Sequence, residues 1–110
     1  MKINKELLKG STSMLILTLL KKKQMYGYEI IKDMELKSNG IFNFKEGTLY
    51  PILHNLEGGD LVRSFWSEGE NLRKRKYYEL TKKGNDALKE KQEEWELFSS
   101  TVNKVILGGE

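Results

Sequence analysis

The chain has 110 residues, 38% of them hydrophobic, which is enough for one domain with a modest core. It has no cysteine and one histidine, His54, so disulfides, thiolate zinc sites and Cys/His or Ser/His nucleophiles are excluded or lack essential parts. We therefore expect no enzyme, no metal and no cofactor. The start of the chain has no signal-peptide pattern and the longest apolar run, residues 14–20, is too short to cross a membrane, which predicts a soluble cytoplasmic protein.

Basic charge is concentrated in the first half of the chain, although the net charge is only +3. Over residues 1–56, Lys and Arg outnumber Asp and Glu by nine to five, whereas over residues 81–110 acids outnumber bases by six to five. This distribution favours phosphate contact by the first part and subunit contact by the last. The alternative is a set of solvated helix faces, and charge alone does not decide between them.

The first predicted helix covers residues 4–22. Its apolar residues occupy more than one stripe, so one side can cover the core while the other meets a neighbouring chain. We expect Leu8 and Leu15 in that second contact. Lys21, Lys22 and Lys23 suit the negative end of the helix dipole.

The second predicted helix covers residues 26–37, with Ile30, Ile31 and Met34 facing inward and residues 38–40 as its stop. Free amides at its start favour a nearby phosphate. Tyr26 and Tyr28 both lie there, and since they cannot both face outward, we expect Tyr28 in the core and Tyr26 facing the phosphate.

The third predicted helix starts near Lys45, after a turn in which Ile41, Phe42 and Phe44 are expected to pack. Asn43 and Glu46 have the spacing of a capping box. Pro51 argues against an earlier start, because a proline deep inside a helix costs about 3 kcal/mol.

The two faces of this third helix differ in character. Leu49, Ile52, Leu53 and Leu56 fall at helical spacing and face inward, which leaves outward Thr48, Tyr50, Pro51, His54 and Asn55. That outer face is short, polar and free of acid, so a duplex could lie against it. Together with the basic residues 73–78 downstream, the pattern is typical of a recognition helix followed by a β-wing.

Two runs, residues 61–66 and 75–80, are rich in aromatic and β-branched residues and predict a hairpin joined by residues 67–74. Strand alternation sends one pair of the basic run to each face, so we expect at least two of its four residues to contact phosphate or the minor groove. The run consists of Arg73, Lys74, Arg75 and Lys76.

Thr81 is predicted to cap a last helix that runs from Lys82 to about Leu107. An apolar seam, interrupted by Lys91, spans fewer than three heptads, so it needs the first helix, its own or a partner's, to complete the packing. The seam consists of Leu88, Trp95, Phe98, Val102 and Val105. We expect these residues in a dimer interface.

Three segments closely resemble the signatures of PadR-type bacterial transcriptional regulators, in the same order and at the usual spacing. They are YGYEI at 26–30, GTLYPILHNLE at 47–57 and RKYYELTKKG at 75–84. The resemblance implies a mainly α protein with a small β-hairpin, in which residues 1–81 form a winged helix-turn-helix and residues 82–110 a dimerisation helix. It also implies a homodimer that binds a pseudo-palindromic DNA operator and usually represses.

The chain departs from the family pattern at two positions. Asp60 stands where most members have glycine, and Asp tolerates a left-handed backbone, so we expect the turn to survive. Lys45 stands where a small hydroxyl residue commonly caps the recognition helix, so either Asn43 caps it or that end frays.

The predicted DNA contacts are Tyr26, Lys45, Gly47, Thr48, Tyr50, Pro51, His54 and the basic run. Tyr50 either presents its hydroxyl to DNA or packs under the wing. Trp95 either packs in the dimer core or stacks on a planar aromatic effector in a cavity between subunits, as the resemblance suggests. The alternative functions are a winged-helix protein-interaction module and a small-molecule-binding dimer without a DNA role.

Overall fold

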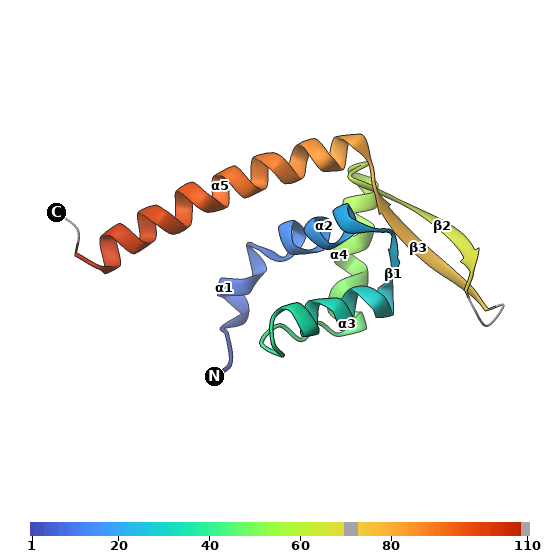
Figure 1. Ribbon diagram of the computed structural model, residues 1–110, viewed down its shortest axis with the longest axis horizontal. Helices are drawn as coiled ribbons and strands as arrows, with labels where there is room; N and C mark the ends of the chain where they lie inside the picture. Colours follow the sequence, from blue (N-terminus) through green and yellow to red (C-terminus); the bar gives the residue numbers. More distant parts are fainter. Residues whose placement is uncertain (70–72, 109–110) are drawn as a thin grey trace.

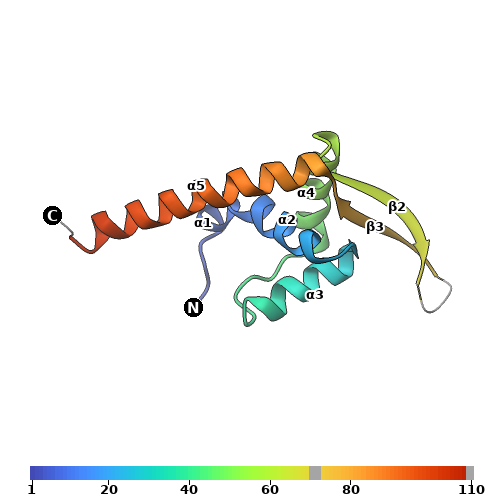
Figure 2. The same ribbon diagram turned by 45° about the horizontal axis from the view of Figure 1, so that its top comes forward.

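The computed structural model describes residues 1–69 and 73–108. The elements are α1 (Lys5–Lys9), α2 (Thr12–Lys22), β1 (Met25–Tyr26), α3 (Gly27–Lys37), α4 (Glu46–Gly58), β2 (Val62–Glu68), β3 (Lys74–Leu80) and α5 (Lys82–Ile106). The molecule is elongated, 59 × 32 × 21 Å. Figures 1 and 2 show α5 leaving the body on one side and the β2–β3 hairpin extending on the opposite side.

The core lies where α2, α3 and α4 meet the base of the sheet. Ile16 and Leu17 of α2, Ile30 of α3 and Leu49 and Leu53 of α4 are fully buried there. The sheet closes one side with Met25, Val62 and Tyr78, and α5 adds Leu88. The predicted fold class, mainly helical with a small β-hairpin, is confirmed.

The sheet has three antiparallel strands in the order β1-β3-β2. The hairpin is confirmed, with β2 extending to Glu68, two residues beyond the predicted end. Residues 70–72 of the predicted connection lie outside the described residues. Strand β1 was not predicted, because two residues are too few to show alternation; it pairs Met25 with Tyr78 and Tyr26 with Tyr77.

The first predicted helix is divided into α1 and α2, so the prediction of one continuous helix over residues 4–22 is wrong. Gly10 lies at the break, where glycine weakens a helix by about 1 kcal/mol relative to alanine. The Thr12 hydroxyl donates to the Lys9 carbonyl, 3.1 Å away, and so binds an oxygen that a continuous helix would use. Asn4 caps α1 by accepting from the Glu6 N–H at 2.8 Å.

The predicted stop of the second helix is confirmed. Asn39 and Gly40 adopt left-handed backbone, with φ of 52° and 80°. The Gly40 N–H donates to the Glu35 carbonyl at 2.8 Å, which satisfies a terminal oxygen of α3.

The start of α4 is as predicted to within one residue, but its capping box does not form. The Asn43 amide donates instead to the Gly40 carbonyl at 2.7 Å, and Lys45 occupies the cap position without a side-chain bond. Phe44 is buried and Phe42 half-buried as expected, whereas Ile41 is exposed because the left-handed turn before it directs it away from the core.

Helix α5 matches the prediction at both ends. The Thr81 hydroxyl accepts from the Gly84 N–H at 2.9 Å, so the predicted cap is confirmed. Across residues 1–69 and 73–108, no helix combines the length and apolar character needed to cross a membrane.

Candidate nucleic-acid interface

The outer face of α4 is arranged as predicted. Leu49, Leu53 and Leu56 are buried and Ile52 is half-buried. The residues exposed on the opposite face are Gly47, Thr48, Tyr50, Pro51, His54 and Asn55. Pro51 cannot donate to the Gly47 carbonyl one turn earlier, but both residues are exposed, so water can reach that oxygen.

Tyr50 contacts the start of α3. The end of its ring lies so close to Gly27 that a Cβ at residue 27 would overlap the phenol. Tyr50 is nevertheless 43% exposed. Glycine at position 27 therefore allows α4 to pack against α3 while Tyr50 still reaches the surface.

An open groove of about 550 Å³ runs from the start of α3, past α4, to the wing. Its lining consists of Tyr26, Gly27, Tyr28, Tyr50, Trp66, Arg73, Lys74, Arg75 and Lys76. Among the described residues, the lining of this basic groove has four cations, four aromatic rings and no acid, a combination that suits a phosphate backbone.

Within the basic groove, Arg75 stacks on an aromatic row. Its guanidinium carbon lies 4.4 Å from the centroid of the Tyr26 ring. Tyr26 meets Tyr77 edge to face at 5.5 Å, and Tyr77 stacks on Phe65 at 5.8 Å. These contacts orient Arg75 before any ligand binds.

The two tyrosines at the start of α3 are placed opposite to the prediction. Tyr28 is 54% exposed and Tyr26 is half-buried. The cause is β1: pairing with Tyr77 turns the Tyr26 ring onto the sheet, and Tyr28 then faces solvent with Lys32 over its ring.

The start of α3 already has an anion beside it. The Glu29 carboxylate accepts from the Tyr26 N–H at 3.2 Å and lies 3.7 Å from the Lys23 ammonium. That amide is therefore not free for phosphate, and the attraction expected at this helix end is reduced.

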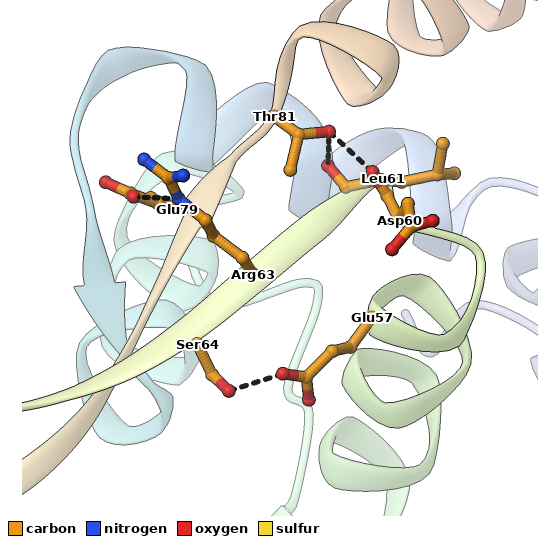
Figure 3. Close-up of polar contacts among 7 residues, drawn as sticks. All are labelled: Glu57, Asp60, Leu61, Arg63, Ser64, Glu79 and Thr81. Atoms are coloured by element: carbon orange, nitrogen blue, oxygen red, sulfur yellow. Dashed lines mark hydrogen bonds and ion pairs between the residues drawn. The ribbon is translucent and has the colours of Figure 1, made fainter.

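Two side-chain bonds fasten the wing. The Ser64 hydroxyl of β2 donates to the Glu57 carboxylate of α4, and Arg63 pairs with Glu79 across the hairpin (Figure 3). Tyr78 is buried beside the first of these bonds. Burial, and to a lesser extent the negative charge of Glu57, raises the pKa of the Tyr78 phenol above its ordinary value of 10.0.

The turn that leads from α4 into β2 is bonded to the start of α5 (Figure 3). Asp60 has a left-handed φ of 61°, as expected for this position. The Thr81 hydroxyl lies 2.6 Å from the Asp60 carbonyl and 3.1 Å from the Leu61 carbonyl. Gly84 packs so closely on Leu61 that a Cβ would overlap the Leu61 carbonyl oxygen.

On the side away from the wing, α1 and α5 enclose an apolar groove of about 780 Å³, whose lining includes Leu7, Met14, Trp95, Phe98 and Val102. Of the predicted dimer residues, Phe98 is 58% and Val105 78% exposed. Leu8, Leu15 and Val102 are half-buried. Leu88 is only 1% exposed, because its own protomer already covers it.

The structure also reveals a groove residue that the sequence did not mark as a contact. Trp66 lies on the same strand face as buried Val62, so alternation alone favours a buried position. The wing extends past the body (Figure 1), however, and Trp66 is 67% exposed. Among the described residues, no three His, Cys, Asp or Glu side chains gather as metal ligands would.

Residues 16–90 match the transcriptional regulator PadR-like family. The structure is similar to that of a transcriptional regulator from Clostridium thermocellum, with 36% identity, a TM-score of 0.83 and coverage of 90% of this chain and 96% of that one. It is also similar to a PadR-like transcriptional regulator from Bacillus cereus, with 33% identity, a TM-score of 0.80 and coverage of 96% and 99%.

An uncharacterised protein of Lysinibacillus sphaericus is 32% identical over 96% of this chain and 97% of its own length. The three signature segments, the winged helix-turn-helix architecture and the long last helix therefore agree with the family match. The chain belongs to the PadR-like family of transcriptional regulators, a family of DNA-binding proteins and not of enzymes.

Proposed function

We propose that this PadR-like regulator represses transcription by binding a pseudo-palindromic operator as a homodimer in the cytoplasm. The observation that carries the proposal is the surface that runs from the polar outer face of α4 into the basic groove, whose described lining contains no acid. Polar side chains on a short exposed helix reach base edges, while cations beside them bind phosphate.

The two parts of this surface have different roles in the proposal. The α4 residues Lys45, Gly47, Thr48, Tyr50, Pro51 and His54 enter the major groove. Tyr26 and the basic run, residues 73–76, contact the backbone or the minor groove. Residues 1–81 then act as the DNA-binding unit and residues 82–110 as the dimerisation helix.

Dimerisation is supported by the apolar groove between α1 and α5. A monomer would leave Trp95 46%, Phe98 58% and Val105 78% exposed, and fully burying an exposed side chain of this kind is worth at most about 1.5–3 kcal/mol. We place Leu8, Leu15 and Val102 beside them in the subunit interface. The two recognition helices would then contact half-sites one turn of DNA apart, roughly 34–36 Å.

The proposal also includes a planar aromatic effector that binds beside Trp95. Trp95 lines the apolar groove and has both a stacking surface and an N–H. A ligand that stacks there and binds one subunit arrangement better than the other would shift the spacing of the recognition helices.

The test is to titrate two duplexes, the DNA upstream of the protein's own gene and an unrelated sequence, at several salt concentrations. Affinity should fall steeply with salt on both. Thr48→Ala or Tyr50→Phe should weaken the upstream duplex more than the unrelated one, by about 1–3 kcal/mol, whereas Arg75→Ala should weaken both alike and lower the salt slope by about one.

Absence of salt-dependent binding to either duplex would show that the DNA proposal is wrong. Binding of a protein partner through α4 would then support the interaction-module alternative, and binding of planar aromatics without DNA would support the carrier.

A further inference from the structure

We propose that Trp66 is a DNA contact of the wing, which lies against the sugar-phosphate surface of the duplex and supplies affinity that does not depend on salt. This inference rests on the proposed DNA-binding function. It adds an apolar contact to a surface that otherwise binds through charge and hydrogen bonds.

The strand register places Trp66 on the side of the wing that faces α4. Residues paired across two antiparallel strands share a face, and Trp66 pairs with Lys76 as Ser64 pairs with Tyr78. Ser64 bonds to Glu57 of α4, and Tyr78 is buried in the core, so this face of the hairpin turns toward the recognition helix. Trp66 and Lys76 therefore lie side by side on that face.

The exposure of Trp66 indicates that it has a partner. Its side chain is 67% exposed, although tryptophan has the largest apolar surface of any residue. It shares the basic groove with Tyr28 and Tyr50. An exposed aromatic cluster of this kind marks an interaction site more often than a free surface.

The positive charge of the basic groove indicates that the molecule bound there is a polyanion. Trp66 shares the described lining of the groove with four cations and no acid. Lys76 lies in register beside Trp66, and Lys74 pairs with the exposed Glu68 farther along the same face. A second copy of the chain is the less suitable occupant, because the apolar groove is lined by α1, α2 and α5. Figure 1 shows α1 and the end of α5 on the side of the molecule away from the wing. In a duplex, deoxyribose rings give an apolar surface between phosphates, where an indole can pack while a lysine beside it pairs with a phosphate.

The test compares the effects of removing Trp66 and Lys76 on DNA affinity and on its dependence on salt. Trp66→Ala should weaken both duplexes at least about tenfold, as truncation of a buried aromatic anchor does, and leave the salt slope unchanged. Lys76→Ala should lower the slope by about one. Trp66→Phe should recover part of the affinity, and Leu36→Ala, which removes an equally exposed apolar side chain outside the groove, should bind as the wild type does.

Fluorescence provides a second readout, because the chain has only two tryptophans. In Trp95→Phe, the remaining emission comes from Trp66, and it should change saturably as duplex is added, at the concentrations where binding occurs. If Trp95→Phe binds DNA but its Trp66 emission does not change, or if Trp66→Ala binds as tightly as the wild type, the inference is overturned and the DNA-binding function stands. If the wild type binds no duplex, the proposed function fails first.

Discussion

The Thr81 hydroxyl lies 2.6 Å from the carbonyl oxygen of Asp60, so the cap of α5 is bonded to the turn that follows α4. One side chain thus serves two elements. It accepts from the Gly84 N–H at the start of α5. It also bonds to Asp60, the left-handed residue in the turn between α4 and β2.

Replacing Thr81 with valine keeps the shape of the side chain and removes both bonds. We expect the free energy of unfolding to fall by about 1–2 kcal/mol, as for loss of a helix cap. Denaturant titration measures this, with Ser100→Ala as the control, since the Ser100 hydroxyl bonds only within its own exposed turn. Equal stabilities of the two variants would contradict the role of Thr81.

Gly84→Ala tests the close packing of α5 on the wing base. Alanine favours a helix by about 1 kcal/mol over glycine, so an open site would gain stability. At residue 84 the added Cβ meets the Leu61 carbonyl, and we expect a net loss of about 1–3 kcal/mol. Gly58→Ala, where a Cβ meets open space in α4, should lose nothing. A stabilised Gly84→Ala protein would refute the packing argument.

Val102→Asp tests the proposed subunit interface. A charge without a partner in an apolar interface should dissociate the dimer or unfold it. Sedimentation reports the mass, and Ser100→Asp places the same charge on α5 outside the apolar groove. A monomeric wild type, or a Val102→Asp dimer of unchanged stability, would contradict the proposed interface.

The effector hypothesis can be tested by fluorescence in Trp66→Phe, which leaves Trp95 as the only tryptophan. Planar aromatic compounds should quench its emission saturably if they stack in the apolar groove. Titration with a varied panel that gives no saturable quenching would leave subunit packing as the role of Trp95.

The raised pKa of Tyr78 predicts a loss of stability at alkaline pH. Its pKa in the folded protein is raised, chiefly by burial, so its neutral form contributes stability that is fully present below the unfolded value of about 10 and lost as pH rises through the higher folded value. The wild type should therefore lose more stability than Tyr78→Phe as pH rises above about 10. If the free energy of unfolding, measured by denaturant titration, falls equally with pH in the two proteins, this contribution of Tyr78 is excluded.

The features that sequence could predict have local signals. The stop of α3 follows from Asn39 and Gly40, the start of α5 from Thr81, and the faces of α4 from the spacing of its leucines. Each depends on residues within one or two turns, so chain order is sufficient to find it.

The missed features depend on residues far apart in the chain. Strand β1 exists because Tyr26 pairs with Tyr77, and that pairing also exchanges the expected positions of Tyr26 and Tyr28. Leu88 fits the heptad pattern equally well in a subunit interface or in its own core, and only the packing of α5 on α2 decides between them. Burial on a strand face likewise depends on what covers it, which is why Trp66 was overlooked.

The break at Gly10 leaves α1 as a five-residue helix with no fully buried residue, in which only Leu8 is half-buried against the core. A helix this short has little stability by itself in water, so α1 needs contacts with residues outside the helix to stay folded. In a separated protomer the backbone amides of residues 5–9 should exchange their hydrogens almost as fast as an unfolded peptide, and association should slow them. Deuterium uptake at the start of the chain would therefore report on assembly without an attached dye and without DNA.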